Sequence, residues 1–452
     1  MQRLDAAGVQ AGDRVAWLGL NDAAQLVLLL ALARLGAILL PLNYRLAHAE
    51  HVAILQDAQA ALLVADATHH PAAESLCLAC ACRMLAATDL TRATGPATAA
   101  LDRGQPHDPL LLVYTSGTTG RPKGALHTQL AVAWNCAMAI RAQNIGAADR
   151  VLTVLPLFHV GGLCIQTVPA LVAGATVVLH PRFDAQAWLR SVQEDRVTLS
   201  LLVPATLRAV QEYADFVTSD LSSLRMVVTG SSIVPLPLIE RLHARGIPVG
   251  QVYGTTETGP VSTFLGKDDA MRRPGSAGKA AWPAEVRLLD ALGVAVAAGQ
   301  VGEICVRAPN LMKGYWNFPQ DPAFQDGWFH SGDLARLDAD GFYWVLGRSK
   351  DMIISGGENI YPAEIENILA GHSDVADVAV LGVADAAWGE VVVAVIVRRG
   401  GATLDEAALR AALDGQLARY KMPRRVVFLD SLPKTALGKV QRAELASRIS
   451  VR

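Results

Sequence analysis

Tyr114-Thr-Ser-Gly-Thr-Thr-Gly-Arg-Pro-Lys-Gly124 is the most informative segment of this 452-residue chain. It begins at the end of a predicted strand, Leu110–Thr115, and we expect a helix over Ala125–Arg141 after it. A loop rich in threonine, serine and glycine with one lysine presents backbone N–H groups, hydroxyls and a cation to polyphosphate oxygens. It is not a Walker A loop, because Pro122 precedes Lys123 and no Gly-Lys-Ser/Thr sequence occurs. The segment therefore predicts a polyphosphate-binding loop; an ordinary polar turn is the alternative.

Composition excludes several classes of protein. Apolar residues make up 52% and charged residues 18%, which is typical of a globular chain with a large core. The 40 Lys+Arg and 42 Asp+Glu give a net charge of −2, so there is no basic excess to bind a nucleic acid. The longest apolar run, Leu26–Leu42, is interrupted by Arg34 and Pro41, so we expect no membrane span. Asp5 precedes any apolar stretch, which argues against a signal peptide, and six cysteines are too few for a disulfide framework; we expect a cytoplasmic protein.

The pattern of predicted elements changes twice along the chain. Up to about Gly266, apolar strands alternate with amphipathic helices, which is typical of a layered α/β domain with mostly parallel sheets. Turn-rich short strands then continue to Leu346 and predict a small antiparallel sheet or barrel, and an α+β domain follows Arg348. The predicted strands before Gly266 are Asp13–Gly19, Ala60–Ala65, Leu110–Thr115, Asp149–Leu155, Ala175–Leu179, Thr198–Val203, Met226–Thr229 and Pro248–Tyr253. The other predicted elements are helices at Asp22–Leu35, Gln186–Arg196, Pro237–Ala244, Pro362–Leu369 and Leu404–Leu417, and strands at Glu285–Leu289, Gly302–Val306, Phe342–Leu346, Val375–Val383, Val391–Arg398 and Arg425–Leu429.

Five further segments combine glycine with polar or charged residues. They are Tyr253-Gly-Thr-Thr-Glu-Thr-Gly259, Ser331-Gly-Asp333, Gly347-Arg-Ser-Lys-Asp351, Ser355-Gly-Gly-Glu-Asn-Ile-Tyr-Pro-Ala-Glu-Ile-Glu366 and Pro433-Lys-Thr-Ala-Leu-Gly-Lys-Val-Gln-Arg442. The first follows a strand and offers an aromatic face, hydroxyls and a carboxylate suited to Mg²⁺ with substrate phosphates. Taken alone, each is also compatible with an ordinary turn.

In this order, the six segments resemble the adenylate-forming superfamily of acyl- and aryl-CoA synthetases, firefly luciferase and peptide-synthetase adenylation domains. The resemblance extends from about Ala11 to Arg442. It implies a large α/β N-terminal domain at residues 1–347, with mostly parallel sheets and a small β-barrel-like subdomain. It also implies a hinge at residues 348–350 and a small mobile α+β C-terminal domain at residues 351–452. The chain begins within what resembles the family's first helix, so we expect the family's usual first strands to be missing.

The resemblance implies an ATP-dependent acid–thiol ligase. Such an enzyme activates a carboxylic acid as an acyl-adenylate, releases pyrophosphate and transfers the acyl group to CoA. The expected cofactors and partners are therefore ATP, Mg²⁺, CoA and a small-molecule carboxylic acid, with a homodimer left open. The first step of this reaction brings two anions, the carboxylate and ATP, together, so positive charge must offset their repulsion.

The resemblance also implies a role for each motif residue. Lys439 bridges the substrate carboxylate and the α-phosphate, Glu257 holds Mg²⁺, and His159 lies at the acyl pocket near the thioester tunnel. Tyr253 stacks on adenine and Asp333 accepts from the ribose hydroxyls. The implied catalytic residues are Lys439, Glu257, His159 and Thr119, and the implied nucleotide-binding residues are Thr115, Ser116, Gly117, Thr118, Thr119, Gly120, Lys123, Gly230, Ser231, Ser232, Tyr253, Gly254, Thr255, Thr256, Asp333 and Arg348.

One active site that performs two reactions favours a domain rotation between them. By resemblance, Lys350 is the hinge residue, and Ser355–Glu358 replace Lys439 after rotation. Gly356 and Gly357 in this segment leave room for the thin pantetheine arm of CoA. Trp388 matches a CoA-contacting tryptophan of aryl-CoA ligases. For Trp388 packing is the alternative, for His159 a structural role, and for the glycine pair a plain turn.

The acyl pocket is the least informative region of the sequence. Thr258-Gly-Pro-Val261 is similar to hydroxycinnamate (feruloyl/4-coumarate)–CoA ligases, and Phe158-His-Val-Gly-Gly162 to o-succinylbenzoate–CoA ligases. No Lys or Arg obviously faces the pocket, which argues against a small dicarboxylate. We expect an aromatic monocarboxylate of hydroxycinnamate or benzoate type. A medium- or long-chain fatty acid, a separate carrier protein as acceptor, and a non-catalytic nucleotide-binding protein are the alternatives.

Cys77, Cys80 and Cys82 lie just after His69 and His70, which is a composition that zinc sites use. The spacing lacks a second Cys-x-x-Cys pair, so we expect no metal there.

Overall fold

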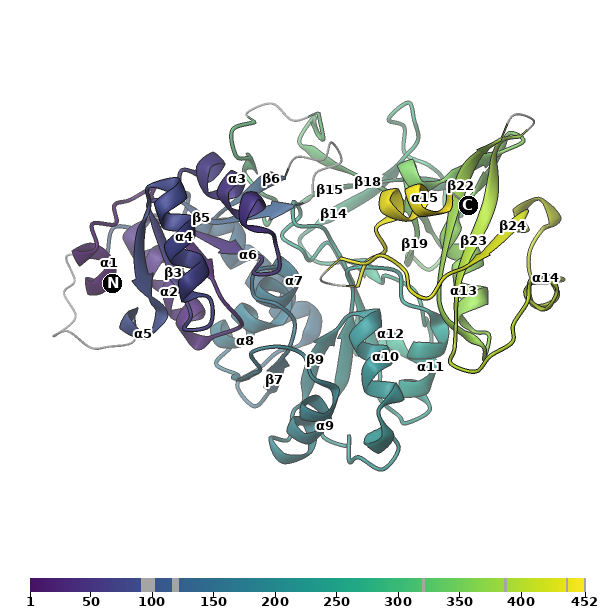
Figure 1. Ribbon diagram of the computed structural model, residues 1–452, viewed down its shortest axis with the longest axis horizontal. Helices are drawn as coiled ribbons and strands as arrows, with labels where there is room; N and C mark the ends of the chain where they lie inside the picture. The colour runs from purple at the N-terminus through teal and green to yellow at the C-terminus, as the bar shows by residue number, and fades with distance from the viewer. Residues whose placement is uncertain (91–101, 116–121, 319–321, 386–387, 436–437, 451–452) are drawn as a thin grey trace.

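The computed structural model describes residues 1–90, 102–115, 122–318, 322–385, 388–435 and 438–450 (Figure 1). Four sheets organise them. Two large, mainly parallel sheets and one antiparallel sheet form the part before residue 349, and a fourth sheet belongs to the C-terminal part. The α/β fold with mostly parallel sheets is therefore as predicted. No helix among these residues is long and apolar enough to cross a membrane.

The first sheet has the strand order β16-β6-β5-β2-β1-β3-β4. Its neighbours β4, β3, β1, β2 and β5 run parallel, and β6 and β16 are antiparallel additions. The unpredicted β2 is fully buried, because both faces of this sheet are covered. The strands are β1 (Arg14–Leu18), β2 (Ile38–Leu42), β3 (Leu62–Ala65), β4 (Arg83–Ala86), β5 (Pro109–Thr115), β6 (Lys123–Thr128) and β16 (Gly314–Tyr315).

The prediction of a helix over Ala125–Arg141 is wrong at its start. Lys123–Thr128 forms β6, which returns antiparallel to β5, and α6 begins only at Gln129. Strand pairing outweighs local helix propensity here. The Thr128 side chain then accepts a hydrogen bond from the Ala131 N–H and caps the helix.

The second sheet has the order β13-β12-β11-β10-β9-β7-β8, parallel from β8 to β11. Its strands are β7 (Arg150–Thr153), β8 (Thr176–Leu179), β9 (Leu199–Leu202), β10 (Met226–Thr229), β11 (Val249–Tyr253), β12 (Thr263–Leu265) and β13 (Lys279–Ala280). The helices before residue 349 are α1 (Gln2–Ala6), α2 (Ala23–Leu35), α3 (His48–Ala58), α4 (His70–Cys80), α5 (Ala87–Leu90), α6 (Gln129–Gln143), α7 (Val160–Gly162), α8 (Val168–Val172), α9 (Ala185–Glu194), α10 (Pro204–Glu212), α11 (Leu236–His243) and α12 (Lys267–Ala270).

The third sheet is antiparallel, with β18 at its centre between β15, β17 and β19. β18 was not predicted from the sequence, although this strand carries Asp333. Its turn-rich Ser331-Gly-Asp333 segment obscures the strand pattern. The strands are β14 (Glu285–Leu289), β15 (Val301–Arg307), β17 (Phe324–Gln325), β18 (Trp328–Leu337) and β19 (Tyr343–Arg348).

The C-terminal part contains β20 (Ile353–Ser355), β21 (Glu358–Ile360), β22 (Val375–Asp385), β23 (Gly389–Arg398) and β24 (Arg425–Phe428) with α13 (Pro362–Ala370), α14 (Glu406–Leu413) and α15 (Arg442–Ser450). Figure 1 shows it beside the second and third sheets. The Arg399 guanidinium lies 2.8 Å from the Glu212 carboxylate of α10, and Arg208 of α10 donates to the Ala376 carbonyl. These contacts hold the C-terminal part in one orientation.

Candidate active site

The site forms where two neighbouring strands of the second sheet end. β10 and β11 pair in parallel, so Gly230–Ser232 and Tyr253–Thr256 leave the sheet at the same edge. This edge, at the carboxyl ends of parallel strands, is where open α/β sheets bind ligands. Only glycine fits at Gly254, because a Cβ there would lie 1.9 Å from the Pro260 carbonyl oxygen. Two predicted nucleotide-binding segments thus lie together.

Asp333 is the centre of a polar cluster at this edge. It lies on β18 opposite Arg348 of β19, with Arg348 Nε 3.2 Å from Asp333 Oδ1. The Tyr253 hydroxyl donates to Asp333 Oδ2 at 2.9 Å. Burial raises the pKa of Asp333, and Arg348 and the Tyr253 hydroxyl act in the opposite direction. The carboxylate is held in place as an acceptor for ligand donors, which suits the two hydroxyls of a ribose.

Lys439 of the C-terminal part faces this cluster. Burial lowers the pKa of its amine, Arg348 lowers it further, and the Asp333 carboxylate raises it. The turn that carries Lys439 is pinned at both ends, since the Thr435 N–H donates to the Lys439 carbonyl at 2.8 Å. A Cβ at Gly438 would meet Ala205 of α10 at 2.8 Å, so the turn packs against the N-terminal part. Lys439 is exposed as a residue, and its amine lies close enough to Asp333 and Arg348 for both charges to affect its pKa.

Glu257, which follows β11, lies next to the ends of the predicted phosphate loop, Tyr114–Gly124, through a shared contact with Tyr315. Its Oε1 accepts a hydrogen bond from the Tyr315 hydroxyl at 2.6 Å, and Lys123 Nζ lies 4.9 Å from the centre of the same tyrosine ring. Thr115 and Lys123 are register partners on β5 and β6, so the two ends of the predicted phosphate loop meet beside Glu257. A partly exposed carboxylate next to a phosphate loop has the chemistry that Mg²⁺ requires, because this ion binds carboxylates together with substrate phosphates.

Two neutral histidines lie near the Glu257 carboxylate. His159 Nδ1 accepts from the Gly161 N–H at 2.9 Å, which places the ring proton on Nε2. Burial lowers the pKa of His159 to about 4, against the raising effect of Glu257. Burial likewise lowers the pKa of His127 to about 4, with Glu257 and the Thr256 carbonyl opposing it. His127 was not predicted from the sequence. It could have been found as a polar residue beside the apolar residues Ala125 and Leu126 after the predicted phosphate loop.

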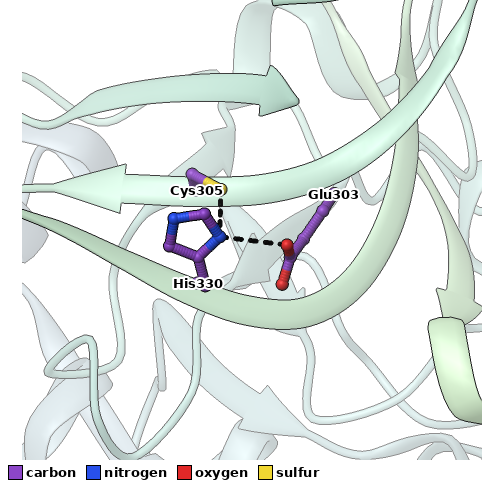
Figure 2. Close-up of side chains that lie close together, drawn as sticks. All are labelled: Glu303, Cys305 and His330. Carbon is purple, nitrogen blue, oxygen red and sulfur yellow. Dashed lines mark hydrogen bonds and ion pairs between the residues drawn. The ribbon is translucent and has the colours of Figure 1, made fainter. Parts of the chain in front are cut away.

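Figure 2 shows a cluster on β15 and β18 that the sequence analysis also missed. Glu303 Oε2 lies 3.0 Å from His330 Nδ1, and Cys305 Sγ lies 3.3 Å from the same nitrogen. Glu303 Oε1 accepts from the Gly332 N–H at 2.8 Å, where φ is +70°, in the left-handed region that favours glycine. Glu303 therefore clamps the backbone turn that presents Asp333.

Glu303, Cys305 and His330 are also residue types that can bind a metal ion. Within the described ranges, Glu303, Cys305 and His330 are the one group of potential metal ligands whose donor atoms all lie within 4.8 Å of one another. Burial raises the pKa of Cys305 to about 12, which favours the thiol in this hydrogen-bonded arrangement. Cys77, Cys80 and Cys82 do not form a three-ligand group with the nearby histidines in the part of the chain that is described.

Five predicted phosphate-loop positions lie outside the described residues. They are Ser116, Gly117, Thr118, Thr119 and Gly120.

Comparison with known proteins identifies the family. Residues 2–316 match the AMP-binding enzyme family, and residues 364–439 match the AMP-binding enzyme C-terminal domain. The chain belongs to the AMP-binding enzymes. This confirms the predicted resemblance and the predicted enzyme class, the ATP-using acyl- and aryl-CoA ligases.

Individual relatives match almost the whole of this AMP-binding enzyme. The chain is 48% identical to the indoleacetate–CoA ligase of Aromatoleum aromaticum and 43% identical to the feruloyl-CoA synthase of an Amycolatopsis species. These matches cover 99% and 98% of this chain and 90% of each relative. ATP-bound MatB from Rhodopseudomonas palustris superposes with a TM-score of 0.92 at 33% identity, over 99% of this chain and 90% of that one. These relatives use ATP and CoA, and Mg²⁺ is the usual metal of such ligases.

The predicted CoA residues of this AMP-binding enzyme lie together at the β20–β21 hairpin. The Gly356 N–H donates to the Trp388 carbonyl at 2.9 Å, and a Cβ at Gly356 would lie 2.7 Å from the Trp388 ring. Gly356 and Gly357 have φ values of +61° and +86°. The Arg424 guanidinium lies 4.0 Å from the centre of the exposed Trp388 ring. Trp388 is therefore partly covered by Arg424 rather than packed in a core, and its contact with CoA stays a prediction.

The first prediction concerns the clamp on the Asp333 turn. Glu303→Ala removes the acceptor of the Gly332 N–H, so we expect the KM for ATP to rise about tenfold, as for a lost hydrogen bond to a charged group. The KM for the acid should change less, because Asp333 is the predicted acceptor for the ribose of ATP and not for the acid. Steady-state kinetics with ATP and acid varied separately measure this. Glu303→Gln keeps an acceptor oxygen and should restore most of the affinity; equal KM values for ATP in wild type and Glu303→Ala would contradict the clamp.

The second prediction concerns the pH dependence of nucleotide binding. Tyr253→Phe keeps the ring and removes the hydroxyl that holds the Asp333 carboxylate ionised, so the pKa of Asp333 should rise further. Because the ionised carboxylate is the form that binds, affinity is lost as the pH falls through this pKa, and a higher pKa moves the loss to higher pH. We expect the acid limb of kcat/KM for ATP to shift upward in Tyr253→Phe. An unshifted acid limb would separate Asp333 from nucleotide binding.

Proposed function

We propose that this AMP-binding enzyme is an aryl-CoA ligase that activates an aromatic monocarboxylate with ATP and transfers it to CoA. The observation that supports the chemistry is that Lys439 of the C-terminal part lies close enough to Asp333 and Arg348 for both to affect the pKa of its amine, beside the carboxylate that we assign to the ribose. The identity of the acid is supported by the relatives at 48% and 43% identity, whose names specify indoleacetate and ferulate.

The arrangement suits the first half-reaction. A carboxylate oxygen attacks the α-phosphorus of ATP, the bond to the pyrophosphate oxygen breaks, and pyrophosphate leaves. Both reactants are anions, so the Lys439 ammonium, placed between them, offsets their repulsion and stabilises the charge that builds up on the α-phosphoryl oxygens. Asp333 and Tyr253 fix the nucleoside, and Lys123 with its loop holds the departing phosphates. Mg²⁺, bound through Glu257 and the phosphates, would supply further positive charge.

The second half-reaction needs a different arrangement of the same parts. The CoA thiol attacks the acyl carbonyl carbon, the bond to the AMP phosphate oxygen breaks, and AMP leaves. We propose that residues 1–347 and 351–452 are the two domains, that they rotate about residues 348–350, and that the β20–β21 hairpin with Gly356 and Gly357 then replaces Lys439. In this proposal the orientation in which Asp333 and Arg348 act on the Lys439 amine is the adenylating one.

Pyrophosphate release from Mg·ATP tests the proposed function. The acids would include ferulate, coumarate, indoleacetate, benzoates, o-succinylbenzoate, malonate and fatty acids of several lengths, each with and without CoA. CoA-dependent turnover of aromatic acids above all others is expected. Turnover confined to fatty acids, or pyrophosphate release without CoA consumption, would contradict the proposal.

We also propose a cytoplasmic location. All six cysteines are free thiols, which suits a reducing compartment. Localisation of a tagged chain in the host cell would test this location.

The oligomeric state is a separate question. Light scattering on the purified protein would distinguish a monomer from the homodimer that the sequence leaves open.

A further inference from the structure

Strand pairing brings Glu303, Cys305 and His330 together (Figure 2). Cys305 of β15 and His330 of β18 are register partners on antiparallel strands, and side chains in such a pair lie close to one another. The register shifts between Glu303 and Cys305, and an irregularity of this kind re-aims side chains. A carboxylate, a thiol and an imidazole therefore point toward one another from two neighbouring strands.

Hydrogen bonds alone match these three groups poorly. Two contacts share one nitrogen, since His330 Nδ1 lies 3.0 Å from Glu303 Oε2 and 3.3 Å from Cys305 Sγ. This nitrogen carries at most one proton. If it donates to the carboxylate, the sulfur has to share the same proton; if it accepts from the thiol, the carboxylate faces a lone pair. A cation, in contrast, accepts a lone pair from all three atoms at once.

The distances between these atoms are close to those of a zinc site. A tetrahedral Zn²⁺, with bonds of about 2.3 Å to sulfur and about 2.0 Å to nitrogen and oxygen, holds neighbouring ligand atoms roughly 3.3–3.6 Å apart. The separations of 3.0 and 3.3 Å around His330 Nδ1 are a few tenths of an ångström shorter. Small rotations of the three side chains are therefore enough to admit the ion.

The chemistry of the three ligands favours Zn²⁺ over Mg²⁺. Zinc binds thiolate, imidazole and carboxylate, whereas Mg²⁺ takes oxygen ligands. A thiolate and a carboxylate contribute two negative charges, which a divalent cation balances. Among the described residues, no lysine or arginine forms an ion pair with Glu303, whose ion-pair partner is His330. The cluster is thus distinct in chemistry from the Mg²⁺ position that we assign to Glu257.

The cluster is open to solvent on one side. The Cys305 side chain is buried, but the side chains of Glu303 and His330 are 29% and 20% exposed. An ion can therefore arrive between the carboxylate and the imidazole and reach the sulfur behind them. Three protein ligands leave a fourth tetrahedral position, which water fills in sites of this type.

We propose that Glu303, Cys305 and His330 form a binding site for one Zn²⁺ ion. On binding, the Zn–S bond forms as the Cys305 S–H bond breaks and its proton goes to solvent. Glu303 Oε2 and His330 Nδ1 each add a lone pair, with the ring proton on Nε2. Glu303 Oε1 keeps the hydrogen bond from the Gly332 N–H, so the ion braces the turn that presents Asp333. The site does not depend on the proposed function.

Metal titration of the purified full-length enzyme tests the site. After removal of bound metal, Zn²⁺ affinity and stoichiometry would be measured in competition with a chromophoric chelator, and Co²⁺ would report on sulfur ligation through its sulfur-to-cobalt charge-transfer absorption. We expect one equivalent of Zn²⁺ and a charge-transfer band. Cys305→Ser should abolish the band and weaken Zn²⁺ binding more than about 100-fold, above the effect of losing an outer-shell partner. Absence of the band from wild type, or its persistence in Cys305→Ser, would overturn the proposal.

The other partly exposed thiols supply the matched control. Cys82 lies 3.2 Å from Cys77, sulfur to sulfur, and is a competing soft ligand. Cys82→Ser should keep both the band and the Zn²⁺ affinity. A band lost in Cys82→Ser and kept in Cys305→Ser would assign the metal to those cysteines and refute the site on β15 and β18.

Glu303→Gln separates the metal ligand from the clamp, because glutamine keeps an acceptor for the Gly332 N–H and loses the negative charge. Zn²⁺ affinity should fall in this variant. Thermal unfolding of each variant checks that it is folded, and Zn²⁺ should raise the unfolding midpoint of wild type but not of Cys305→Ser. A midpoint raised equally in both proteins would show that the stabilising ion binds elsewhere and would contradict the proposal.

Discussion

Lys439→Ala should lower the rate of adenylate formation by about 10²–10³-fold or more, the range expected when one group that stabilises a transition state is lost. In the structure its amine is within the electrostatic reach of Asp333 and Arg348, the residues to which we assign the ribose and phosphate of ATP. The reaction brings two anions together, and Lys439 is the lysine of the C-terminal part that we assign to offset their repulsion. Pyrophosphate release in single turnover would measure the loss.

Thioester formation from supplied acyl-adenylate is the matched control for Lys439→Ala. Lys439 is proposed to leave the site before CoA enters, so this second step should keep most of its rate in the variant. Equal losses in both steps would refute a role confined to adenylation. Lys434→Ala is a useful comparison, because Lys434 is in the same turn as Lys439 but pairs with Asp377 of β22, so its loss should affect adenylation much less.

Lys350→Pro should have the reverse effect. Lys350 lies in a short 3₁₀ turn, Ser349–Asp351, between β19 and β20. Proline is tolerated in the first turn of a helix but fixes φ near about −65°, so the present orientation should persist while rotation is hindered. We expect adenylation to continue and thioester formation to fall about 10²-fold, the scale of loss when reacting groups are held out of position.

The control for the hinge is Lys350→Ala, which removes the charge and leaves the backbone free to rotate. It should behave like the wild type in thioester formation. Rapid-quench measurement of both half-reactions in the two variants separates stiffness from charge. Unchanged thioester formation in Lys350→Pro would count against rotation about residues 348–350.

The two variants together distinguish one mobile site from two separate ones. If a single cleft serves both reactions, the two variants should stop at different stages. Lys439→Ala should leave the acid and ATP unreacted. Lys350→Pro should accumulate bound acyl-adenylate that does not react with CoA. A site that performed both steps without rearrangement would show parallel losses in both variants. The contacts of Arg399 with Glu212 and of Arg208 with the Ala376 carbonyl would have to break during rotation.

The sequence by itself predicted the family and the motif segments. The segments Tyr114–Gly124, Tyr253–Gly259 and Ser331–Asp333 carry this information locally, because phosphate and ribose binding require glycine, hydroxyl and carboxylate groups at short spacing. Strands such as Met226–Thr229 were also predicted with their observed bounds, since strands buried on both faces read as continuous apolar runs.

Only the tertiary structure decided which distant residues meet. β6 is a strand because β5 pairs with it, although its sequence favours a helix. Asp333 faces Arg348 because β18 and β19 are in register, and it is held in place by Glu303 from a third strand, 30 residues earlier in the chain. Local patterns specify residue types, but partners far apart in sequence are chosen by strand pairing and by the need to satisfy buried polar groups.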